Sequence, residues 1–149
     1  MKIIIAGSRK FKDYEYLKKK CVDIISELQY AWEVPSTDIE IISRHTDGAD
    51  KLGEMFAEEF GLKVVLFPAD WKDMSPPVMI GTNAFGQYNI LAGKNRNQKM
   101  LDYAGMDGVT IGFVFGESKG TKDMIKISKK AGIPTFRIDT QKDLTKRFN

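Results

Sequence analysis

Short apolar runs recur along the chain at intervals that predict five strands. The runs are rich in isoleucine, valine and aromatic residues and cover residues 2–6, 39–43, 62–67, 109–115 and 135–138. Mostly continuous apolar character, without a regular polar alternation, is typical of parallel strands that are covered on both faces. The pattern therefore favours a buried parallel sheet.

The segments between these runs carry apolar residues at helical spacing. The predicted apolar faces consist of Leu17, Cys21, Ile24, Ile25, Leu28 and Trp32; of Leu52, Met55, Phe56 and Phe60; of Met100 and Leu101; and of Met124, Ile127, Ser128 and Ala131. Asp13 is placed to cap the first helix, Gly61 to end the second, and residues 132–134 to end the fourth. Residues 139–148 predict a short polar helix.

Strands that alternate with helices indicate βαβ units with right-handed crossovers. The predicted fold is therefore α/β, a Rossmann-like three-layer domain with about five parallel strands, and residues 1–149 form one domain. In such folds ligands bind beyond the carboxyl ends of the strands, near the point where the strand order reverses.

Residues 107–130 contain the strand, loop and helix that most directly suggest a binding site. The run at 109–115 is followed by Gly-Glu-Ser-Lys-Gly-Thr at residues 116–121, and a helix is predicted over residues 122–130. Glycines before a helix let backbone N–H groups reach an anion, often a phosphate. Thr121 adds a hydroxyl, and Lys119 or Lys122 adds positive charge. The alternative is an ordinary strand-to-helix turn.

Residues 72–92 keep neither a helical nor a strand period. Prolines and glycines punctuate this segment, yet its apolar content is too high for plain disorder. Long irregular loops in compact domains are usually lids or binding loops. We therefore expect a lid-like insertion or an oligomer contact. In the second case the protein would be a homo-oligomer.

Composition narrows the class of protein. The hydrophobic content of 42% and the charged content of 29% are ordinary for a soluble globular protein. No apolar run approaches the roughly 20 residues that span a bilayer, and the first residues fit a strand better than a secretory signal. Cys21 is the single cysteine and His45 the single histidine, which excludes an internal disulfide and disfavours a metal site. The prediction is a cytoplasmic protein without a cofactor, metal or membrane partner.

Charge adds a preference for an anionic ligand. The net charge of +3 suits a small anion but is too low to argue for nucleic acid. The dinucleotide fingerprint GxGxxG and the Walker A lysine motif are both absent from the sequence. Their absence disfavours NAD-dependent dehydrogenases and P-loop nucleoside triphosphatases.

Four loops, at residues 7–9, 43–50, 70–96 and 116–121, are expected to meet at the carboxyl edge of the sheet. The candidate ligand-binding residues in these loops or directly beside them are Gly7, Ser8, Arg9, Arg44, His45, Asp47, Asp50, Asp70, Trp71, Arg96, Asn97, Gly116, Ser118, Lys119, Gly120 and Thr121. Arginine grips phosphate oxygens with two parallel N–H groups. An aromatic ring such as Trp71 could stack on a base, and a carboxylate could hold ribose hydroxyls.

Structural roles compete with several of these assignments. Asp47 and Asp50 also suit the start of a helix, where the helix dipole favours a negative charge. Arg96 could be solvated or ion-paired, Trp71 could cover the edge of the core, and His45 could be a bystander.

Five segments in a fixed order resemble one family. They are IIIAGSR at residues 3–9, DGADKL at 47–52, FPADW at 67–71, GKNRNQKM at 93–100 and KGTKDM at 119–124. On these segments the chain resembles the YspA-type, cpYpsA-related branch of the SLOG superfamily, which is related to the LONELY GUY phosphoribohydrolases and to DNA-processing protein A. The resemblance implies a Rossmann-like domain that binds a nucleotide or a nucleotide-derived small molecule. It places Gly120 and Thr121 in the phosphate loop and implies a pocket lined by Ser8, Arg9, Asp47, Asp50, Arg96 and Asn97.

Three departures from the family pattern affect this expectation. The loop after the second strand, glycine-rich in the family, reads Ser-Arg-His-Thr-Asp at residues 43–47. The phosphohydrolase-like pattern PGGxGTxxE is reduced at residues 116–124, where Met124 stands at the glutamate position. Asp123 lies one residue earlier, which is a rotation of about 100° on a helix. The segment before Arg96 is also longer than is usual in the branch.

Three functions remain open at this point. The first is a binding protein, either a sensor or a protein that sequesters a phosphate-bearing nucleotide signal, and the missing glutamate and long insertion favour it. Small SLOG proteins without partner domains also occur in phage genomes, so a phage origin would fit.

The second function is an enzyme that hydrolyses the N-glycosidic bond of nucleoside 5′-monophosphates. Its catalytic candidates are Asp47, Asp50, Asp123 and Glu117. The third is binding of single-stranded DNA through a basic stripe formed by Lys119, Lys122, Lys126 and Lys130. A solvated face is the commoner meaning of such a stripe, and no aromatic residues interleave it for base stacking.

Overall fold

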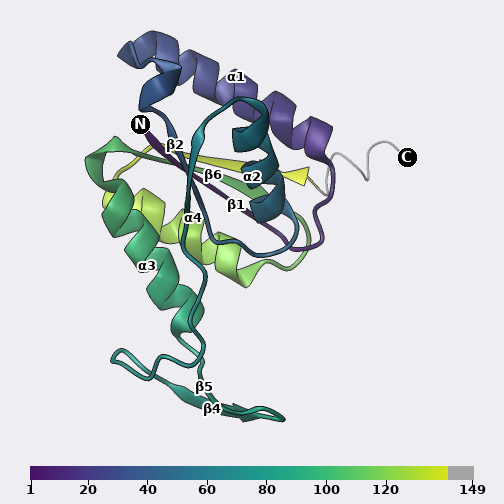
Figure 1. Cartoon of the computed structure of the whole chain (residues 1–149), viewed down its shortest axis with the longest axis vertical. Helices are drawn as coiled ribbons and strands as arrows, with labels where there is room; N and C mark the ends of the chain where they lie inside the picture. Colours follow the sequence, from purple (N-terminus) through teal and green to yellow (C-terminus); the bar gives the residue numbers. More distant parts are fainter. Residues whose placement is uncertain (141–149) are drawn as a thin grey trace.

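The computed structural model describes residues 1–140 and contains a five-stranded parallel sheet with the strand order β3-β2-β1-β6-β7 (Figure 1). The strands are β1 (Lys2–Gly7), β2 (Glu40–Ser43), β3 (Lys63–Leu66), β6 (Gly108–Val114) and β7 (Thr135–Asp139). The chain builds the sheet outward from β1 to β3 and then returns to place β6 on the other side of β1. The strand order therefore reverses between β1 and β6, and the predicted α/β fold is confirmed.

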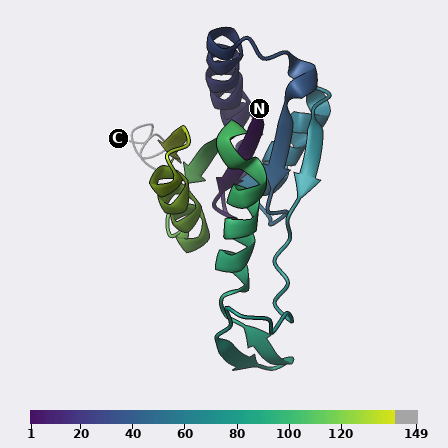
Figure 2. The same cartoon turned by 90° about the vertical axis from the view of Figure 1, so that its left-hand side faces the viewer.

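Within residues 1–140, four α-helices cover the two faces of this sheet (Figure 2). They are α1 (Tyr14–Trp32), α2 (Ala49–Glu59), α3 (Ala92–Ala104) and α4 (Lys119–Ala131). The short 3-10 turns η1 (Ser36–Asp38) and η2 (Gly105–Asp107) precede β2 and β6. None of the helices in residues 1–140 is both long enough and apolar enough to cross a membrane. The helix predicted at 139–148 falls almost wholly outside the described residues.

The central strand β1 supplies both layers of the core. Ile3 and Ile5 belong to the cluster that packs under α1 and α2, whereas Ile4 and Ala6 belong to the cluster under α3 and α4. Successive side chains of a strand point to opposite faces, so an unbroken apolar run fills two cores at once. Cys21 is fully buried in the first cluster, and burial raises the pKa of its thiol.

The buried face of α4 differs from the predicted one. It consists of Thr121, Met124, Ile125 and Ser128, while Ala131 is exposed and Ile127 is half-buried. Ile125 turns inward because Gly112 of β6 leaves space for it. A Cβ at Gly112 would lie 2.7 Å from Cδ1 of Ile125.

Three residues predicted on apolar faces are about half exposed. The exposed fractions are 47% for Trp32, 49% for Met55 and 46% for Phe60. Trp32 is the last residue of α1, and Phe60 follows the end of α2. In α2 the residue that meets the sheet is Gly53, whose absent side chain lets the helix approach Ile5 and turns Met55 outward. The cap at Asp13 and the end of α2 near Gly61 are confirmed.

Residues 72–91, called the arm below, fall in the expected insertion and contain a hairpin that the sequence pattern did not predict. The arm contains the antiparallel hairpin of β4 (Ile80–Asn83) and β5 (Gly86–Asn89). Both views show this hairpin projecting away from the body of sheet and helices (Figures 1 and 2). Glycines at 81 and 86 and mixed polar residues conceal the strand alternation in the sequence.

Candidate functional site

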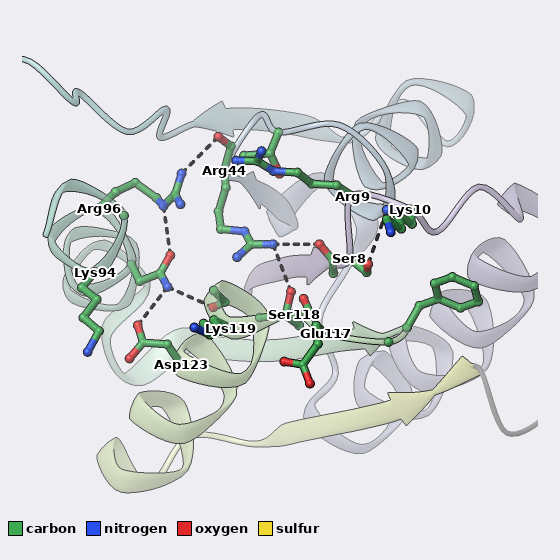
Figure 3. A pocket seen from close by; sticks show the side chains of 18 of the residues that line it. Ser8, Arg9, Lys10, Arg44, Lys94, Arg96, Glu117, Ser118, Lys119 and Asp123 are labelled. Atoms are coloured by element: carbon green, nitrogen blue, oxygen red, sulfur yellow. Dashed lines mark hydrogen bonds between the residues drawn. The ribbon is translucent and has the colours of Figure 1, made fainter. Parts of the chain in front are cut away.

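A cavity of about 790 Å³ lies where the loops after β1, β2 and β6 meet the starts of α3 and α4 (Figure 3). This is the carboxyl edge of the sheet at the reversal of strand order, the expected place for a ligand. The cavity is lined by Gly7, Ser8, Arg9, Lys10, Arg44, Thr46, Trp71, Ile90, Gly93, Lys94, Arg96, Asn97, Phe115, Gly116, Glu117, Ser118, Lys119, Gly120, Thr121 and Asp123.

The structure brings most of the predicted ligand-binding residues to this one cavity. The predicted residues that do line it are Gly7, Ser8, Arg9, Arg44, Trp71, Arg96, Asn97, Gly116, Ser118, Lys119, Gly120 and Thr121. The predicted residues outside the lining are His45, Asp47, Asp50 and Asp70. Of the catalytic candidates, Glu117 and Asp123 line the cavity. The sequence analysis did not include Lys10 and Lys94, although Lys10 directly follows the loop at residues 7–9 and Lys94 lies within the loop at residues 70–96.

Asp50 lies beneath the cavity as a structural carboxylate and is fully buried. Nε and Nη2 of Arg44 donate to its two oxygens, each over 3.0 Å. The backbone N–H of Gly7 donates over 3.1 Å, and the Thr46 hydroxyl also donates to it. Nη2 of Arg44 further donates to the Gly7 carbonyl and to Oγ1 of Thr121. This network ties β1, β2, α2 and α4 together and sets the shape of the cavity floor.

His45, Asp47 and Asp70 lie away from the cavity. His45 adopts a left-handed backbone conformation with a φ of 63°, and its Nδ1 lies 3.0 Å from the carboxylate oxygens of Glu54. Asp47 is exposed, and Asp70 accepts a hydrogen bond from the backbone N–H of Lys72. Within residues 1–140, no three histidine, cysteine or acidic side chains gather closely enough to hold a metal ion.

The start of α4 reaches the cavity without a capping side chain. Its N-cap residue Ser118 makes no side-chain cap hydrogen bond, and its first turn contains no acidic residue. The helix begins at Lys119, three residues earlier than predicted, so Gly120 and Thr121 lie in its first turn. A Cβ at Gly120 would stand 3.0 Å from Nη1 of Arg44, so a side chain there would crowd the guanidinium. The positive end of a helix dipole is thus left open at the cavity.

Arg96 of α3 is a buried cation with only neutral partners. It is 8% exposed, and it forms no ion pair with any carboxylate in residues 1–140. Its Nε donates over 2.9 Å to Oδ1 of Asn97, whose Nδ2 donates to the Gly120 carbonyl and to the Asp123 carboxylate (Figure 3). Asn97 therefore fixes Arg96 relative to the start of α4.

The electrostatic surroundings of Arg96 are unfavourable for its charge. Burial and the positive charge of Arg44 lower the pKa of Arg96 to about 10, Asp50 opposes this change, and Arg9 adds to the lowering. The guanidinium still carries its proton at neutral pH, so the protein holds an incompletely compensated cation there. A bound anion would relieve this cost.

One guanidinium nitrogen of each buried arginine is available to a ligand. Arg44 uses Nε and Nη2 for its hydrogen bonds, and Arg96 uses Nε and Nη1. Within the described residues, no fully buried side-chain nitrogen or oxygen lacks a partner. Nη1 of Arg44 and Nη2 of Arg96 are therefore accessible, and both residues line the cavity.

The fold and the site together define a Rossmann-like α/β domain with a cationic cavity at the switch point of its sheet. Residues 1–73 match the model of the YAcAr family, described as the YspA, cpYpsA-related SLOG family. This match confirms the resemblance inferred from the sequence. No curated protein and no solved structure gives a match.

Proposed function

We propose that this protein binds a nucleotide-derived small molecule through a phosphate group held at the start of α4. The observation that carries the proposal is the convergence of an uncapped helix start with Arg44 and Arg96, each with an accessible guanidinium nitrogen. Backbone N–H groups and forked guanidinium groups are the usual donors for phosphate oxygens. Membership of the SLOG family supports a nucleotide as the source of that phosphate.

The rest of the cavity suits the remainder of a nucleotide. Its volume of about 790 Å³ falls in the range of small-molecule sites. Trp71 and Ile90 give it an apolar side, where Trp71 offers a ring for stacking. Arg9, Lys10, Lys94 and Lys119 supply further positive charge around the rim. We favour a sensor or a signal-sequestering protein of the cytoplasm, as the sequence suggests.

Titration calorimetry with a panel of nucleotides, each paired with its parent nucleoside, tests this proposal. We expect at least one linear or cyclic nucleotide to bind. Its nucleoside should bind at least about 100-fold more weakly, because charge-assisted hydrogen bonds contribute about 1.5–3 kcal/mol each. Absence of binding by every nucleotide at high micromolar concentration, or equal binding of nucleotide and nucleoside, would contradict it.

Hydrolysis of an N-glycosidic bond is the second candidate function, and the positions of two carboxylates favour it. Glu117 and Asp123 line the same cavity as the arginines, and the carboxylate of Asp123 is oriented by Nδ2 of Asn97 over 3.0 Å. Asp47 lies outside the cavity, and the oxygens of Asp50 are occupied by its partners. Of these four carboxylates, only those of Glu117 and Asp123 could therefore stabilise a cationic sugar or position water.

Chromatographic detection of free base from nucleoside 5′-monophosphates tests the enzymatic alternative. If turnover occurs, Glu117→Gln or Asp123→Asn should lower it by about 100-fold or more, the usual loss for a general acid or base. Asp102→Asn, which changes an exposed carboxylate on α3, is the matched control. Turnover that survives when Glu117→Gln and Asp123→Asn are combined would exclude this mechanism. If a nucleotide binds but no base is released, only the binding function is supported.

The basic stripe does not change this preference. Lys119, Lys122, Lys126 and Lys130 are all exposed along α4, and Lys119 also lines the cavity. An exposed stripe of this kind is compatible with a solvated helix face. DNA binding therefore stays a less favoured prediction.

A further inference from the structure

The outer edge of β4 is an unpaired strand edge. The N–H of Ile90 donates to the Met79 carbonyl over 2.7 Å, which makes these two residues a hydrogen-bonded pair of the hairpin. Such pairs alternate along antiparallel strands, so Ile80 and Thr82 direct their N–H and C=O groups away from β5. Among residues 1–140, the hydrogen bonds of turns, loops, caps and side chains do not use the backbone groups of Ile80 or Thr82 either.

The opposite edge of the hairpin, along β5, is already covered. The N–H of Asn89 donates to the Trp71 carbonyl over 2.7 Å. The ammonium group of Lys72 donates to the carbonyls of Phe85 and Gln87 over 3.4 and 3.2 Å. A lysine on a strand edge is a common means of preventing further pairing. The arm thus has one blocked edge and one open edge.

The open edge lies in an uncharged and apolar part of the surface. Residues 74–93 contain no charged side chain, although 29% of the chain is charged. Met79 is 55% exposed, Ile80 57% and Phe85 87%. Neither strand of the hairpin contains a proline or a charge that would discourage edge pairing. An isolated two-stranded hairpin is marginal in water, so additional strands would stabilise it.

We infer that β4 pairs antiparallel with β4 of a second copy of this chain and forms a four-stranded sheet across a two-fold axis. A two-fold axis brings a strand against itself in the antiparallel sense, and the two open edges then satisfy each other. Each chain carries a net charge of +3, and the uncharged arm lets two such chains meet without repulsion at the contact. The arm projects from the body in both views, so a second copy can approach its edge (Figures 1 and 2).

Other partners fit the arm less well. A strongly acidic or basic partner would find no opposite charge in residues 74–93. Insertion into a bilayer would leave the backbone groups of Ile80 and Thr82 without partners in hydrocarbon, which is strongly unfavourable. Strand pairing satisfies the same groups directly. Trp71 and Ile90 at the base of the arm also line the cavity, but the pairing does not depend on a ligand there.

Sedimentation velocity of the full chain over a concentration series tests this inference. We expect a species of twice the 16.9 kDa chain mass. Ile80→Lys places two like charges across the two-fold axis and should raise the dimer dissociation constant by about tenfold or more. Gln87→Lys adds the same charge to the blocked edge and is the matched control, with a change of about twofold or less expected.

Hydrogen exchange supplies a second measurement that does not rely on a variant. The amides of Ile80 and Thr82 should become protected as the concentration of wild-type protein rises. A monomer at every concentration, equal weakening by the two lysine substitutions, or a dimer whose β4 amides stay unprotected would overturn the inference. If the wild-type protein stays monomeric and floats with neutral phosphatidylcholine vesicles, while Ile80→Lys does not float, the inference would be overturned in favour of a membrane contact.

Discussion

Replacing Asp50 with alanine should destabilise the fold by about 3–5 kcal/mol, because the change leaves the buried charge of Arg44 without a partner. Asp50 is fully buried and accepts four hydrogen bonds from three residues, and Arg44 is 4% exposed. Denaturant unfolding followed by circular dichroism would measure the loss. Asp47→Ala, an exposed carboxylate in the same loop, is the control and should change stability by about 0.5 kcal/mol or less.

A double-mutant cycle separates the charge pair from a general loss of packing. If the pair acts as a unit, replacing Arg44 and Asp50 together should cost clearly less than the sum of the two single changes. A coupling near zero, or an Asp50→Ala variant as stable as the wild type, would show that this network does not hold the cavity floor together.

Replacing Arg96 with methionine should weaken binding of the nucleotide identified by calorimetry by about 2–5 kcal/mol, which is roughly 30-fold to several thousand-fold in the dissociation constant. The stability of the unliganded protein should change little or increase, because a buried cation without an ion-pair partner is removed. Lys99→Met changes an exposed cation on the same helix and should leave the affinity within about twofold of the wild type.

Arg96→Lys gives a finer test of the same residue. It keeps the positive charge but loses the planar fork, so an intermediate affinity is expected. If Arg96→Met binds as tightly as Lys99→Met, the guanidinium does not contact the ligand. If Arg96→Met unfolds, Arg96 is a structural residue instead of one kept for an anion.

Local sequence patterns predicted the strands of the main sheet, but they did not predict which faces of α2 and α4 are buried. The apolar runs locate all five strands of the main sheet, and the runs of β1 and β2 each place residues in both cores. The rotation of α4 depends on Gly112 in a neighbouring strand, and that of α2 depends on Gly53 lying against Ile5. These are contacts between distant segments, which helical periodicity alone does not encode. The β4–β5 hairpin was missed because Gly81 interrupts its alternation.

The candidate site was predictable to a similar degree. Loops after parallel strands meet at one edge, so Arg9, Arg96 and Gly120 could be expected in one cavity, and all three line it. The position of Asp50 was not predictable, since helix capping and ligand binding both fit its place in the sequence. Its side chain instead accepts hydrogen bonds from Arg44, which directly follows strand β2.

The central claim is that the start of α4 holds the phosphate of a nucleotide. The most direct test is a nuclear magnetic resonance titration of the nitrogen-15-labelled protein with a nucleotide that binds and, separately, with its nucleoside. The phosphate should shift the backbone amides of Lys119, Gly120 and Thr121 more strongly than any others, and the nucleoside should leave them nearly unchanged. If the nucleotide binds while these amides stay unshifted, the start of α4 does not hold the phosphate.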